Sequence, residues 1–227
     1  MISKRKILFY IYGLSIGGVE KLLVDVLRKI DHTLFAVDLC ARTGRGVYFD
    51  DIPEQVHLID YEKCILKDYD VEVAFLEGSD TRNIALRKSA AVKIVWVHSD
   101  LYTSRLSAIG YRGDCEEAMC YSMMDKIVFV SQTSMQQFDK LFPGIDVNKQ
   151  VIYNLIEKED ILSKSQATAC PIKKTKLTLC SIGRLAPVKG FERLIPILSS
   201  LNLIFITGSL VMALTGNSLK ISLNITT

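Results

Sequence analysis

The chain has 227 residues, of which 49% are apolar and 23% are charged, and its formal net charge is +3. This length allows one large domain or two small ones with a sizeable core, and the small charge gives no reason to expect nucleic-acid binding. The six cysteines form no Cys-x-x-Cys pair and lie far in sequence from the three histidines, so reduced thiols are expected rather than a zinc site.

Apolar runs alternate with helical patterns along the first 160 residues. The continuous apolar run 6–12 predicts a buried strand, a glycine turn follows at 13–18, and apolar residues then recur at helical spacing from Val19 to Ile30. Further strands are expected at 34–40, 56–59, 71–76, 92–97, 126–130 and 151–153, and further helices near 81–88, 115–124 and 133–141. This alternation predicts an α/β fold with a Rossmann-like, doubly wound parallel sheet, whose ligand site lies at the carboxyl ends of the strands.

The composition changes after this region. Residues 163–174 are polar and lack periodicity, which is typical of a linker. A strand at 177–182 and a helix from about Gly190 to Leu198 then predict the first strand–helix unit of a second Rossmann-like domain. The expected organisation is therefore an N-terminal domain at 1–160, a linker at 161–175 and the start of a C-terminal domain at 176–200.

Three loops carry candidate functional residues. Gly17 and Gly18 lie between a strand and a helix, where backbone N–H groups can approach a diphosphate; a tight packing turn is the alternative. His98 ends a strand, where it could transfer a proton, hydrogen-bond a sugar hydroxyl or serve only the structure. Arg184 and Lys189 flank one loop and could together neutralise a diphosphate, or could form a solvated basic loop.

One further pattern, Asp68-Tyr69-Asp70, has the form of a metal-binding Asp-x-Asp motif. It precedes a predicted strand instead of following one, so it points away from the expected ligand site. We therefore expect a solvated loop here and no metal site.

Taken together, these motifs resemble glycosyltransferase family 4, whose members have the two-domain GT-B fold. The resemblance extends over roughly residues 5–198. The motifs that carry it are Gly17-Gly18-Val19-Glu20, Val95-Trp96-Val97-His98, Val128-Phe129-Val130-Ser131, Val151-Ile152-Tyr153-Asn154 and, most specifically, Ser181-Ile182-Gly183-Arg184-Leu185 with Val188-Lys189-Gly190-Phe191.

The resemblance implies transfer of a sugar from a nucleoside-diphosphate sugar to an acceptor hydroxyl, with retention of configuration. It implies no metal and no cofactor besides the donor substrate. The N-terminal domain would hold the acceptor, while the donor would lie mostly on the C-terminal domain. The implied roles are donor-phosphate binding for Gly17, Gly18, Arg184 and Lys189, contact with the transferred sugar for the catalytic position His98, and substrate binding for Asp100, Ser131 and Asn154.

The segment 69–78 and the His98 motif are similar to members that assemble bacterial polysaccharides. The partners implied are a nucleotide sugar and a saccharide or lipid-linked saccharide acceptor, without nucleic acid. The N-terminus does not have the pattern of a signal peptide, and the apolar stretch 201–214 is short and interrupted. We therefore expect a cytoplasmic protein with peripheral contact at the inner face of the membrane.

The resemblance stops near Leu198, where the family has a strand that ends in Val-Gly-Asp-Gly-Pro and, further on, two donor-binding glutamates. Back-translation of residues 204–214 is compatible with that motif in another reading frame. We therefore expect a frameshift between about Leu198 and Phe205, an out-of-frame tail at 201–227, and almost no transferase activity from this chain alone.

Two other functions remain open at this stage. The chain could be a non-catalytic remnant or module that keeps only the acceptor site. It could also be an unrelated Rossmann-type enzyme such as a dehydrogenase, although it lacks Gly-x-Gly-x-x-Gly and a suitably placed acid after the second strand.

Overall fold

The computed structural model describes residues 3–167, 189–200, 213–214 and 219–220. The chain divides into two units, Met1–Ala167 and Thr168–Thr227. The predicted strand at 177–182, Arg184 and most of the predicted out-of-frame tail lie outside the described residues.

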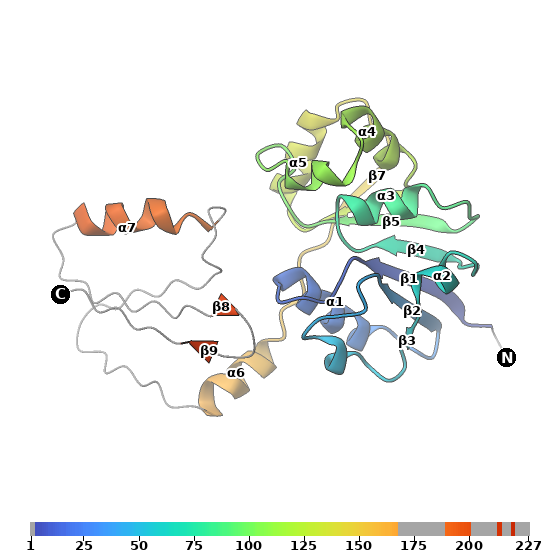
Figure 1. The fold of residues 1–227 in the computed structure, drawn as a ribbon, viewed down its shortest axis with the longest axis horizontal. Coiled ribbons are helices and arrows are strands. Elements are labelled where there is room, and N and C mark those ends of the chain that lie inside the picture. Colours follow the sequence, from blue (N-terminus) through green and yellow to red (C-terminus); the bar gives the residue numbers. More distant parts are fainter. Residues whose placement is uncertain (1–2, 168–188, 201–212, 215–218, 221–227) are drawn as a thin grey trace. The chain divides into compact units, whose positions relative to one another are not determined.

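The first unit is built on a seven-stranded, all-parallel sheet with the strand order β3-β2-β1-β4-β5-β6-β7 (Figure 1). Between β1 and β4 the direction of the strand order reverses, and such a switch point is where open α/β sheets bind ligands. The predicted Rossmann-like α/β fold is confirmed. The strands are β1 (Arg5–Ile11), β2 (Phe35–Ala41), β3 (His57–Leu58), β4 (Val71–Ala74), β5 (Val92–Val97), β6 (Lys126–Phe129) and β7 (Asn148–Val151).

Both faces of the sheet are covered, because successive residues of each strand point to opposite sides. Leu8 and Tyr10 of β1 belong to one apolar core, and Phe9 and Ile11 belong to the other. Helix α1 packs on the second core, whereas α3, α4 and α5 pack on the first. The helices of this unit are α1 (Gly18–Lys29), η1 (Phe49–Asp51), α2 (Tyr61–Cys64), α3 (Ser79–Ala85), η2 (Leu106–Gly110), α4 (Asp114–Ser122), α5 (Gln132–Leu141) and α6 (Lys158–Ala167).

The strand predicted at 151–153 lies earlier in the chain than expected. The strand is β7, which begins at Asn148 and ends at Val151, so Ile152 and Tyr153 follow it. This edge strand pairs only with β6. Its extent is therefore determined by backbone hydrogen bonds to one neighbour, and its polar residues Lys149 and Gln150 need no burial.

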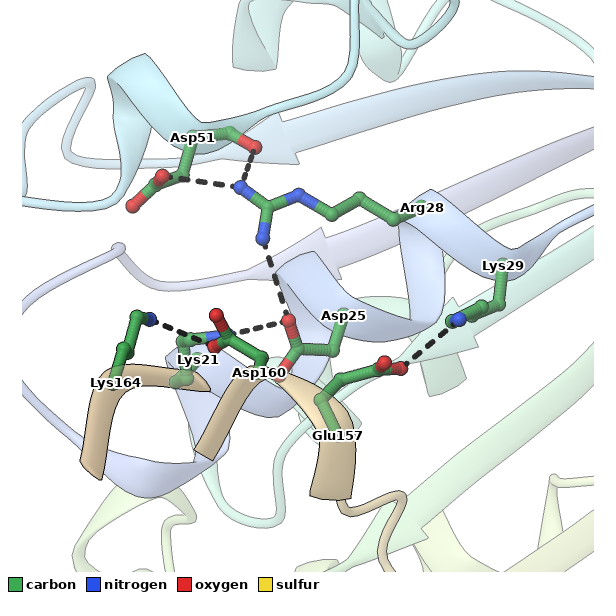
Figure 2. Close-up of polar contacts among 8 residues, drawn as sticks. All are labelled: Lys21, Asp25, Arg28, Lys29, Asp51, Glu157, Asp160 and Lys164. Carbon is green, nitrogen blue, oxygen red and sulfur yellow. Dashed lines mark hydrogen bonds and ion pairs between the residues drawn. The ribbon is translucent and has the colours of Figure 1, made fainter. Parts of the chain in front are cut away.

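Helix α6 occupies the beginning of the predicted linker, and residues 168–175 of that linker lie outside the described residues. The helix lies beside α1, and charged side chains connect the two (Figure 2). Lys29 Nζ is 3.3 Å from Glu157 Oε1, just before α6, and Lys164 donates to Asp160 at 2.7 Å within it. The hydrogen bond from Lys164, supported by the charge of Lys21 on α1, lowers the pKa of Asp160. None of the α6 side chains is buried.

In the second unit, helix α7 (Phe191–Ser200) confirms the helix predicted from about Gly190 to Leu198. Two short strands, β8 (Ala213–Leu214) and β9 (Leu219–Lys220), pair in antiparallel orientation. Among the helices of the described ranges, none is both long and apolar enough to cross a bilayer.

Candidate functional site

The carboxyl ends of the parallel strands form one edge of the sheet, and most of the predicted site residues follow those ends. Gly17 and Gly18 come after β1, and His98 comes directly after β5. Lys189 is described but belongs to the second unit. The edge also carries the three predicted substrate-binding positions, which are Asp100 after β5, Ser131 after β6 and Asn154 after β7.

The glycine turn after β1 leads into α1, and at Gly18 no other described part of the protein covers the start of this helix. Gly17 is the N-cap of this helix and provides no side-chain cap, and Gly18 is its first residue. A Cβ built on Gly18 would meet no atom within 4 Å, whereas one on Gly17 would collide with the carboxylate of Glu20. An anion at this helix N-terminus would therefore have free access at Gly18 and would displace Glu20 from Gly17.

The first turn of α3 and the loop after β2 hold the glycine turn in place. The backbone N–H of Tyr12 donates to Asp80 Oδ2 at 2.9 Å, at the switch point between β1 and β4. Asp80 is 1% exposed, and this burial raises its pKa to about 7, although the Tyr12 hydrogen bond favours the carboxylate. The loop after β2 adds backbone hydrogen bonds from Thr43 N to Tyr12 O, 2.9 Å, and from Leu14 N to Arg45 O, 3.4 Å.

His98 is packed among aromatic rings at the end of β5. Its ring centroid is 5.2 Å from that of Phe75 and 6.1 Å from that of Trp96. Both ring nitrogens are buried, and neither forms a hydrogen bond of normal geometry with the described residues. Burial lowers the pKa of His98, while the charge of Glu77 and the nearby Phe75 carbonyl oppose that shift. The lowered pKa favours a neutral imidazole, which has one donor and one acceptor, and within the described residues the Phe75 carbonyl lies near enough to act on it.

Glu77 fixes the backbone beside this histidine. Its Oε2 accepts a hydrogen bond from His98 N at 2.9 Å, and its Oε1 accepts one from Ser99 Oγ at 2.5 Å. Because Glu77 follows β4, it joins the loops after β4 and β5. The sequence alone predicted no role for Glu77 or Asp80. The available signal for Glu77 was its place directly after the predicted strand 71–76, at the edge where a ligand site is expected, whereas Asp80 lies in the helix that follows.

Asp100 and Ser131 stabilise their own loops. Asp100 accepts hydrogen bonds from Tyr102 N, Thr103 N and Thr103 Oγ1 at 3.0, 3.0 and 2.6 Å, and the hydroxyl contact with Thr103 contributes most to lowering its pKa. Ser131 is the N-cap of α5, and its Oγ accepts from the Ser134 amide at 3.1 Å. Asn154 is exposed. Substrate contact by these residues stays a prediction.

The Asp-x-Asp pattern lies at the amino end of β4, on the opposite edge, as predicted from its place before the strand. Asp68 and Asp70 are exposed, and Asp70 Oδ2 accepts a hydrogen bond from Lys6 N at 2.7 Å. Within the described part of the chain, no group of three or more histidine, cysteine, aspartate and glutamate residues could hold a metal ion.

No protein-family model matches the chain, and no curated protein is significantly similar to it. The identification of the first unit therefore goes as far as a parallel, Rossmann-like α/β domain.

Proposed function

We propose that the first unit is the acceptor-side domain of a glycosyltransferase. The enzyme would transfer a sugar from a nucleoside-diphosphate sugar to a hydroxyl of a saccharide or lipid-linked saccharide, with peripheral contact at the inner membrane face. The observation that supports this most is His98 at the carboxyl edge of the sheet, whose two buried ring nitrogens form no hydrogen bond of normal geometry with the described residues.

Buried polar side-chain atoms are usually hydrogen-bonded, and a pair left without partners calls for an explanation. A histidine needed only for packing against Phe75 and Trp96 could be replaced by an apolar ring. A neutral imidazole can both donate to and accept from sugar hydroxyls, which are themselves donors and acceptors. Contact between His98 and the transferred sugar, after a side-chain movement that exposes a ring nitrogen, would satisfy these nitrogens and would explain the Glu77 hydrogen bond that fixes the adjacent backbone.

The donor diphosphate would meet the start of α1 at Gly17 and Gly18. The partial positive charge of a helix N-terminus favours an anion, and Gly18 has no side chain to block its approach. In this proposal Arg184 and Lys189 would supply further positive charge from the second unit, where they would stabilise the leaving diphosphate.

His98→Phe tests the central contact. Because phenylalanine keeps an aromatic ring against Phe75 and Trp96, we expect the free energy of unfolding to stay within about 1 kcal/mol of wild type, or to rise as unpaired nitrogens are removed. Affinity for the preferred donor among UDP-glucose, UDP-N-acetylglucosamine and GDP-mannose should fall roughly 2–10-fold, the value of a lost hydrogen bond. Ligand-observed NMR on the 227-residue chain measures this donor affinity.

His57→Phe is the matched control, because it makes the same replacement at an exposed residue of β3. It should leave donor affinity unchanged. Equal affinity in wild type and His98→Phe would contradict the role of His98, and the absence of binding by all three donors would contradict the proposed function.

Gly18→Ala tests the diphosphate contact separately from folding. The added methyl group fits the free structure at the first residue of α1, so the free energy of unfolding should stay within about 0.5 kcal/mol of wild type. The same methyl group would obstruct phosphate at the helix N-terminus, so nucleotide-sugar affinity should fall. Gly144→Ala, also without a neighbouring atom within 4 Å of the new Cβ, should not affect affinity. Unchanged affinity in Gly18→Ala would exclude this turn as the phosphate site.

A further inference from the structure

A cavity of about 550 Å³ lies beside the glycine turn, at the carboxyl ends of β2 and β3. Its apolar part includes Leu39, Ile59 and Phe49, and its polar part comes from the loop after β2 and from the start of α2. None of the residues implicated above in donor binding lines it. The cavity is therefore a second feature of the ligand-binding edge.

Arg42 is the cation of this cavity. Its guanidinium carbon lies 5.2 Å from the centre of the Tyr61 ring, which restricts the side chain to the cavity wall. Among the described residues it forms no ion pair and no side-chain hydrogen bond, so its planar set of N–H donors remains available to an anion. Its positive charge also acts on Asp80 at the switch point. Burial raises the pKa of Asp80, and the charge of Arg42 partly opposes that rise.

The segment that carries Tyr61 also offers acceptors to the cavity. Asp60 and Glu62 flank Tyr61 and contribute to the lining, and Asp60 Oδ2 is 3.4 Å from Lys63 Nζ. Carboxylates accept hydrogen bonds from hydroxyl groups, but they repel a ligand that is anionic throughout. The lining therefore matches a ligand with one anionic group near Arg42 and hydroxyls elsewhere.

We propose that this cavity binds the acceptor as an acidic saccharide, with Arg42 bound to a carboxylate or phosphate substituent and with Asp60 and Glu62 accepting hydrogen bonds from ring hydroxyls. Describing this ligand as the acceptor rests on the proposed function. Recognition of an acidic saccharide by Arg42 does not rest on the proposed function, because this recognition depends only on the charges and hydrogen-bonding groups of the cavity.

The test measures binding of five probes to the 227-residue chain by NMR: methyl glucuronide, glucose 1-phosphate, the neutral methyl glucoside, inorganic phosphate and adenosine 2′-monophosphate. An acidic sugar should bind roughly tenfold more tightly than methyl glucoside, and Arg42→Gln should remove that advantage, as expected for a charge-assisted hydrogen bond. Arg45→Gln is the matched control, because Arg45 is exposed in the same loop but does not line the cavity. It should leave binding unchanged.

Preference for glucuronide would identify a carboxylate ligand, and preference for glucose 1-phosphate would identify a phosphate ligand; either supports the proposal. The proposal would be overturned if charged and neutral sugars bound equally well, or if no sugar bound. It would also be overturned if Arg42→Gln had no effect on binding, or had the same effect as Arg45→Gln. Inorganic phosphate that binds as tightly as the sugar phosphate would show that the sugar is not recognised. Tighter binding of adenosine 2′-monophosphate than of either acidic sugar would indicate a nucleotide site and also overturn it.

Gly18→Ala separates this proposal from the proposed function. That variant should weaken nucleotide-sugar binding and leave acidic-sugar binding intact, because Gly18 does not line the cavity. Acidic-sugar binding that depends on Arg42, without any nucleotide-sugar binding, would sustain the cavity assignment while the glycosyltransferase proposal failed.

Discussion

Replacing Arg87 with alanine should lower the free energy of unfolding by about 3–5 kcal/mol, the usual effect of removing one partner from a buried ion pair. Arg87 Nε donates to Glu72 Oε1 at 3.0 Å, and the Glu72 side chain is fully buried within β4. Arg87 also donates to the carbonyl oxygens of Cys64 and Lys67 at 2.9 and 3.0 Å. Alanine would leave a buried carboxylate and two carbonyls without these donors.

Urea unfolding of the 227-residue chain measures the change. Arg28→Ala is the matched control, because Arg28 pairs with Asp51 at 3.0 Å on the surface, where such pairs contribute only about 0–1 kcal/mol. Its longer contact with Asp25, at 3.5 Å, leaves that carboxylate paired with Lys21 when it is lost. Arg87→Ala should also be less damaging in a Glu72→Gln background, since the stranded charge is then absent. A loss below about 1.5 kcal/mol for Arg87→Ala would show that the pair is not a main support of this part of the sheet.

Asp80→Asn should stabilise the protein at pH 8 by roughly 2–4 kcal/mol and have little effect at pH 4. Burial raises the pKa of Asp80 from 3.8 to about 7, and each pKa unit corresponds to about 1.4 kcal/mol. An asparagine can still accept the hydrogen bond from Tyr12 N and can donate toward Ser79 Oγ, which lies 3.3 Å from the present Oδ1. The replacement therefore removes the buried charge but retains the hydrogen bonds.

The direction of the pH dependence follows from the raised pKa. Between about pH 4 and pH 7 the folded protein keeps the Asp80 proton and the unfolded chain releases it, so wild-type stability falls as pH rises through this window. Other titrating groups are common to both proteins, so the difference between wild type and Asp80→Asn isolates this residue. Denaturant unfolding at pH 4, 6 and 8 should show that difference growing with pH, and a constant difference would contradict the assignment.

The fold was predictable because most strands inside the sheet are short, apolar and separated by helical patterns. The predicted strand 92–97 matches β5, and the helix expected from Val19 to Ile30 is α1 displaced by one residue. In these elements burial on both faces of the sheet determines the pattern, so local composition is informative. At β7 the polar residues Asn148 and Gln150 join the sheet through backbone hydrogen bonds, which no apolar pattern reveals.

The candidate site was predictable only in part. His98 and Gly18 could be found because a strand–turn–helix pattern places them at the ligand-binding edge. The hydrogen bond from Tyr12 to Asp80 joins residues 68 positions apart, and that from His98 to Glu77 joins residues 21 apart. Such contacts arise when strands are placed side by side, so local composition does not report them. The capping role of Ser131 could have been inferred, since serine before a helical pattern is a usual N-cap.

Helix α6 has a consequence for the size of the folded unit. Its side chains are all outside the core, and charges connect it to α1 (Figure 2). Dissolved ions screen such attractions, with a Debye length that shortens from about 10 Å at 0.1 M salt to about 3 Å at 1 M, whereas the two apolar cores are insensitive to this screening. Raising the ionic strength should therefore weaken the attachment of α6 to α1 and leave the sheet and its two apolar cores in place.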